Sequence, residues 1–113
     1  MTNEDMVMLE RSIEHAKRAI ELGNNVDRLV NNRDFKKLIL DEYLREEPIR
    51  LVHLLSDPSM NSPESRQAIT VQMEAISSFR RFLENKTQLA EISRKSLAYD
   101  EQAREDMLIE GDD

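Results

Sequence analysis

The sequence contains no cysteine and no tryptophan, and only two glycines and three prolines occur among its 113 residues. The absence of cysteine excludes disulfides and thiolate metal ligands, so we expect a protein of a reducing compartment. No apolar run has the length of a signal peptide or a membrane span, and we expect neither. Because aromatic residues make up 4% of the chain, the core has to consist of aliphatic side chains, methionine and alanine.

The chain is acidic, with a formal net charge of −7. The acidity is concentrated near the C-terminus, where residues 86–113 hold eight acids and four bases. Nucleic-acid affinity depends on Lys and Arg side chains that neutralise phosphates, so this balance argues against a nucleic-acid partner. We interpret the small basic cluster of Arg33, Lys36 and Lys37 as a solvated helix face.

Few side chains are suited to catalysis or metal binding. The two histidines, His15 and His53, are interpreted as packed or surface residues, and the sequence offers no thiol nucleophile. The spacings that di-iron bundles, zinc proteases, calcium loops and phosphate loops require are all absent. The sequence therefore predicts a non-enzymatic protein with no catalytic residue, no metal, no cofactor and no small-molecule substrate.

Apolar residues at spacings of three and four predict a first helix over about residues 3–31. Thr2 to Asp5 resemble a capping box at its start. The stripe consists of Met6, Leu9, Ile13, Ala16 and Ile20. Around Gly23 the apolar residues leave this stripe, so we expect that the helix breaks there or that its apolar seam rotates.

A second helix is predicted over about residues 34–55, where Pro48 either kinks the helix or begins another. After a polar loop, Ser62 followed by Pro63 has the pattern of a helix start. No Gly or Pro occurs from Glu64 to Glu110, which predicts a third, long helix.

The third helix is expected over about residues 63–108, and an acidic tail over residues 109–113. Together the three helices predict an all-α fold: an antiparallel helical hairpin or bundle with one long C-terminal helix, coiled-coil-like, in a single domain of residues 1–113. The apolar stripes of the second and third helices are the expected partner-binding surface. Its residues are Leu51, Leu55, Ile69, Ile76, Phe79 and Leu83.

Three stretches resemble small helical structural and assembly proteins of tailed bacteriophages. They are residues 35–44 (FKKLILDEYL), 50–54 (RLVHL) and 75–79 (AISSF), within a region of about residues 30–85. Pro48 departs from the pattern, because such proteins usually have an ordinary helix former there. The resemblance implies a phage-encoded protein of the virion or of head and packaging assembly, located in the host bacterial cytoplasm or the virion. It transfers no functional residues.

The leading hypothesis is a non-enzymatic helical interaction or assembly factor that associates with itself or with larger phage proteins. The alternative is a small acidic inhibitor of a host nuclease or another defence enzyme. In that case its carboxylates would occupy a surface that normally binds nucleic acid.

Overall fold

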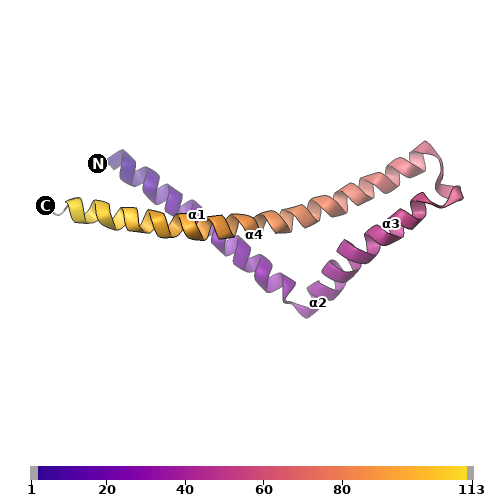
Figure 1. Cartoon of the computed structure of the whole chain (residues 1–113), viewed down its shortest axis with the longest axis horizontal. Helices are drawn as coiled ribbons and strands as arrows, with labels where there is room; N and C mark the ends of the chain where they lie inside the picture. Colours follow the sequence, from indigo (N-terminus) through magenta and orange to yellow (C-terminus); the bar gives the residue numbers. More distant parts are fainter. Residues whose placement is uncertain (1–2, 112–113) are drawn as a thin grey trace. The chain divides into compact units, whose positions relative to one another are not determined.

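The computed structural model describes residues 3–111, and helices account for most of them. The elements are α1 (Asn3–Val30), α2 (Arg33–Phe35), the π-helix η1 (Lys36–Glu46), α3 (Glu47–Leu55), the 3₁₀-helix η2 (Pro58–Met60) and α4 (Pro63–Gly111) (Figure 1). No strand occurs within this range. The predicted all-α class, with one long C-terminal helix, is confirmed.

The chain divides into two compact units, and each pairs antiparallel helices. Unit 1 comprises Met1–Val26 with Asn85–Asp113, and unit 2 comprises Asp27–Glu84. In unit 1, α1 lies beside the second half of α4; in unit 2, η1 and α3 lie beside the first half of α4 (Figure 1). The hairpin arrangement of the helices is therefore also confirmed. Whether the chain behaves as a single domain stays a prediction.

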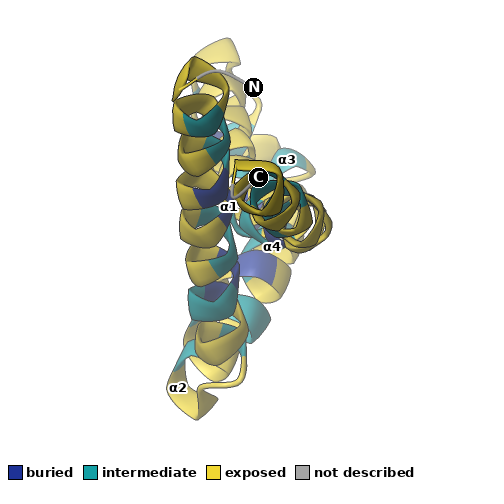
Figure 2. Ribbon diagram, turned by 90° about the vertical axis from the view of Figure 1, so that its left-hand side faces the viewer, coloured by how far each residue is buried: buried dark blue, intermediate teal, exposed yellow. Residues whose placement is uncertain are grey.

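Helix α1 continues through Gly23, where the sequence predicts a break or a rotated seam. The buried residues of α1 are Ile13, Ala16, Gly23 and Val26, which lie along one side of the helix (Figure 2). A Cβ atom at Gly23 would overlap the Cβ atom of Ala90 on α4. Glycine thus occupies a position of the stripe and lets the two helices of unit 1 approach closely. The predicted capping box includes Thr2, which lies outside the described residues.

The core of unit 2 forms between α3 with η1 on one side and the first half of α4 on the other. Leu44, Leu51, Ile69 and Ile76 are buried in it. Half-buried apolar residues surround these four: Ile39, Leu40, Leu54, Leu55, Met60, Met73 and Leu83. Aliphatic side chains and methionine make up this cluster, as the shortage of aromatic residues predicts.

Three consecutive elements replace the single kinked α-helix expected over residues 34–55. Asn32 caps α2 by accepting a hydrogen bond from the Phe35 amide at 2.9 Å. The backbone of η1 then forms bonds from residue i+5 to residue i, which end with the Glu47 amide donating to the Glu42 carbonyl. Pro48 lies in the first turn of α3, so the proline begins a new α-helix.

The start of α4 agrees with the sequence pattern. Pro63 is its first residue, and the Ser65 amide donates to the Ser62 hydroxyl at 3.1 Å. The helix reaches Gly111, so residues 109–111, predicted as tail, are helical; residues 112–113 lie outside the described range.

Replacing Ser62 with alanine should lower the free energy of unfolding by about 0.5–2 kcal/mol, because the Ser65 amide loses its acceptor. Urea denaturation measures the change. Ser77→Ala, at an exposed position inside α4, is the control and should have little effect. Equal losses from both changes would contradict a capping role.

Candidate protein-interaction surface

The six residues predicted to bind a partner lie together in unit 2, in and around its own core. Leu51, Ile69 and Ile76 are buried, and Leu55 and Leu83 are half-buried beside them. Phe79 keeps 36% of its surface exposed, and its ring contacts Tyr43 edge to face with the centroids 5.9 Å apart. Their role as partner-binding residues stays a prediction, since the structure uses most of them to join α3 and α4.

A second row of mostly apolar side chains lies on α4 in unit 1, and most of it is exposed. Its members follow each other at spacings of three, four, three and four residues: Leu89, Ile92, Ser96, Tyr99 and Ala103. We call these five residues the outer stripe. Leu89, Ile92 and Tyr99 expose 48%, 63% and 77% of their surfaces. A heptad spacing of this kind is the pattern by which one helix packs along another.

The outer stripe is separate from the face of α4 that packs on α1. Ala90 is buried and Leu97 is half-buried, and seven residues correspond to about two helical turns, so these two share a face. The apolar spacing from which the partner-binding surface is predicted follows this face alone and does not include the outer stripe. The signal was present as a second repeat of three and four, displaced by one residue from the first.

Opposite charges flank the outer stripe. Lys95 precedes Ser96 and is exposed, and Asp100 follows Tyr99 and is half-buried. Asp100 accepts a hydrogen bond at 2.6 Å from the Ser12 hydroxyl on α1 through Oδ2. Lys95 and Asp100 are five residues apart. In a parallel coiled coil, this separation brings a residue of one helix close to the oppositely charged residue of the other helix.

Polar contacts around the edge of the apolar seam hold α1 on α4 in unit 1. Arg94 donates to the Asn24 side-chain oxygen at 2.9 Å, and the Arg104 guanidinium lies 3.6 Å from the Glu10 carboxylate. Both contacts are partly exposed, so each stabilises the pair modestly. They join residues of α1 and α4 that lie opposite each other.

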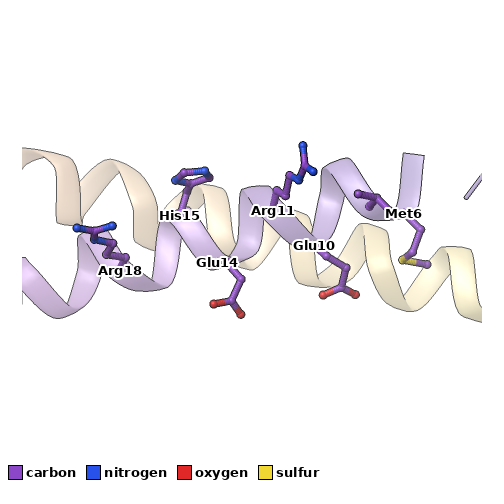
Figure 3. Close-up of a pocket in the computed structure, with 7 residues that line it drawn as sticks. Met6, Glu10, Arg11, Glu14, His15 and Arg18 are labelled. Atoms are coloured by element: carbon purple, nitrogen blue, oxygen red, sulfur yellow. The ribbon is translucent and has the colours of Figure 1, made fainter. Parts of the chain in front are cut away.

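A groove of about 530 Å³ runs along α1 in unit 1. All its lining residues come from that one helix: Met6, Val7, Glu10, Arg11, Glu14, His15 and Arg18. Figure 3 shows Arg11, His15 and Arg18 on one side, and Met6, Glu10 and Glu14 on the other. A groove supported by a single helix has no opposite wall to enclose a small ligand, so we do not regard it as a catalytic pocket.

Local contacts at helix ends account for the carboxyl groups whose pKa values are altered. The side-chain hydrogen bond from Arg50 lowers the pKa of Glu47, and the pKa of Asp57 is lowered by hydrogen bonds from the Ser59 amide and hydroxyl. Asp57 is exposed and Glu47 is half-buried, and the residues that donate to their carboxyl groups are two or three positions away. These pKa values report turn structure rather than a reactive site.

Within residues 3–111, no three His, Cys, Asp or Glu side chains are grouped so that they could hold a metal ion. No helix in this range is both long enough and apolar enough to cross a membrane. Comparison of the chain with protein-family models, with curated proteins and with solved structures finds no match.

Proposed function

We propose that this chain is a non-enzymatic helical factor that binds other helices. Its first partner is a second copy of the chain, and the two copies contact each other through their outer stripes. The observation that supports this most directly is the exposure of Leu89, Ile92 and Tyr99 at heptad spacing on α4. In water these side chains gain about 25 cal/mol per Å² of apolar surface that a partner covers. The face of α4 that holds Ala90 and Leu97 packs on α1 in unit 1.

Charge complementarity favours a parallel arrangement of the two copies. Lys95 of each copy would face Asp100 of the other, on both edges of the paired stripes. Oδ1, the second carboxylate oxygen of Asp100, would accept the hydrogen bond from the Lys95 ammonium of the other copy. Oδ2 would keep its hydrogen bond from Ser12. The stripe spans about two heptads, so a short interface with concentration-dependent association is expected.

The proposed role belongs to phage structure or assembly. The resemblance of residues 30–85 to small helical proteins of tailed bacteriophages supports this part of the proposal, and the location we propose with it is the host bacterial cytoplasm or the virion. A self-associating helical factor can present repeated binding surfaces to a larger virion or packaging protein.

The alternative role, as an acidic inhibitor, has less support. It requires carboxylates that are available to a host enzyme. Asp100 accepts a hydrogen bond from Ser12, and Asp106 accepts one from Gln102 at 3.1 Å. Part of the C-terminal acidity is therefore engaged in contacts within unit 1.

Replacing Ile92 with lysine should weaken self-association at least about tenfold, because a charge is placed in the centre of the stripe. Sedimentation equilibrium over a range of protein concentrations measures the dissociation constant. Lys95→Gln should weaken association less, since it removes only an ion pair at the edge.

The matched control is Val52→Lys, which places the same charge on an apolar residue of unit 2 that is 48% exposed. This variant should associate like the unaltered chain. The proposal would be contradicted by an unaltered chain that stays monomeric up to millimolar concentration, or by equal effects of the two lysine variants.

A further inference from the structure

The π-helix η1 is unusually long, at 11 residues. Bonds from residue i+5 to residue i occur mostly as single-turn bulges inside α-helices, and often at functional positions. In an α-helix each carbonyl bonds the amide four residues later instead of five, so the two registers differ by one residue in the position of the donor. The segment therefore has a nearby alternative that uses the same backbone groups.

The burial pattern explains why the sequence adopts the π register. Phe35 is half-buried and Leu44 is buried in the core of unit 2, and Ile39, which lies between them in sequence, packs against that core. In an α-helix of 3.6 residues per turn, nine residues make about two and a half turns and place Phe35 and Leu44 on opposite faces. The wider π turns keep both inside and leave Lys36 and Lys37 exposed.

The C-terminal end of η1 contains a carbonyl that lacks its α-helical donor. In an α-helix the amide of residue 48 would donate to the Leu44 carbonyl, but proline has no N–H. The Arg80 guanidinium, which comes from α4, donates a hydrogen bond to that carbonyl oxygen. A side chain 36 residues away thus donates to the carbonyl that residue 48 would bond in an α-helix.

We propose that residues 36–46 are a two-state element, in which Pro48 and Arg80 together hold the π register against an α-helical one. Pro48 removes the donor that would extend the α register back from α3. Arg80 satisfies the Leu44 carbonyl and fixes η1 against α4. In the α register Phe35 and Ile39 move toward solvent, and Lys36 and Lys37 move toward α4. The change of register therefore replaces two apolar side chains by two basic ones on the side of this segment that faces α4.

The first test changes the proline. Pro48→Ala gives residue 48 an amide that can donate to Leu44, so the α register should become populated. NMR couplings across hydrogen bonds identify each donor and acceptor directly. We expect the Glu47 amide to couple to Tyr43 in this variant, and to Glu42 in the unaltered chain. Pro58→Ala, in η2, is the control and should keep the Glu42 coupling.

The second test removes the guanidinium while keeping a long side chain. In Arg80→Met, amide exchange over residues 40–47 should be at least about tenfold faster, because the hydrogen bond from a charged group is lost. Arg80→Lys, which keeps a donor, should recover part of the protection. The matched control is Arg81→Met, at the neighbouring exposed arginine, and it should leave these rates unchanged.

Either of two results overturns the proposal. One is a Glu47 amide that remains coupled to Glu42 alone in Pro48→Ala. The other is equal exchange over residues 40–47 in Arg80→Met and Arg81→Met. Pro48→Ala places a strong helix former in a helix, so this variant is expected to fold even if Arg80→Met does not.

Discussion

Replacing Leu51 with alanine should lower the free energy of unfolding by about 2–5 kcal/mol. Leu51 has 0% of its surface exposed and lies in the core of unit 2 with Leu44, Ile69 and Ile76. The change removes buried methyl groups and leaves a cavity between α3 and α4. Small domains are stable by about 5–15 kcal/mol, so the loss is a large fraction of the total. Urea or guanidinium denaturation followed by circular dichroism measures it.

The neighbouring residue provides the matched control. Val52 is 48% exposed on the same helix, and Val52→Ala should change the free energy of unfolding by less than about 1 kcal/mol. If both variants lose the same free energy, the burial pattern of α3 described above is incorrect.

Gly23→Ala should destabilise unit 1 by about 1–3 kcal/mol, although alanine is the better helix former. In an exposed helix this change would gain about 1 kcal/mol. Here the new methyl group would overlap the Cβ atom of Ala90, and it would also lie 3.3 Å from the Lys86 carbonyl oxygen. Neither atom belongs to a flexible side-chain end, so α1 and α4 have to move apart. Thermal and urea denaturation should both show the loss.

A double substitution tests the cause of this effect. Ala90→Gly alone should cost free energy, because it removes a helix former and a buried methyl group. Combined with Gly23→Ala, it should recover part of the stability, since the methyl group then lies on the opposite helix. Gly111→Ala is the control without steric conflict, because no atom lies within 4 Å of a Cβ atom at that position. Strictly additive losses in the double variant would rule out the proposed overlap.

The overall fold could be predicted because the breakers of regular structure are few and their positions decide the helix ends. Ser62 and Pro63 set the start of α4 through local hydrogen bonds and a fixed proline angle, which any sequence reading can recognise. The long helix follows because its sequence contains no glycine or proline from Glu64 to Glu110. Such effects act within a few residues of each other.

The register of η1 could not be predicted from periodicity, because the interpretation assumed 3.6 residues per turn. The Arg80 side chain, which donates to the Leu44 carbonyl of η1, is remote from Leu44 in sequence. Gly23 was misinterpreted for a similar reason: its role depends on the close approach of Ala90, which spacing within α1 does not show. The outer stripe could not be predicted for a similar reason. Two rows of α4 have helical spacing, and the sequence does not show that the row with Ala90 and Leu97 packs on α1.

The division of the chain into two units determines the order in which their contacts can form. Unit 2 is one continuous stretch, Asp27–Glu84, so its partners are all present once that stretch has been synthesised. Unit 1 joins Met1–Val26 to Asn85–Asp113, and its first helix has to wait for the last part of the chain. Local contacts form faster than distant ones, which favours unit 2 in folding as well. During translation, the apolar side of α1 is therefore left without its partner until the second half of α4 leaves the ribosome.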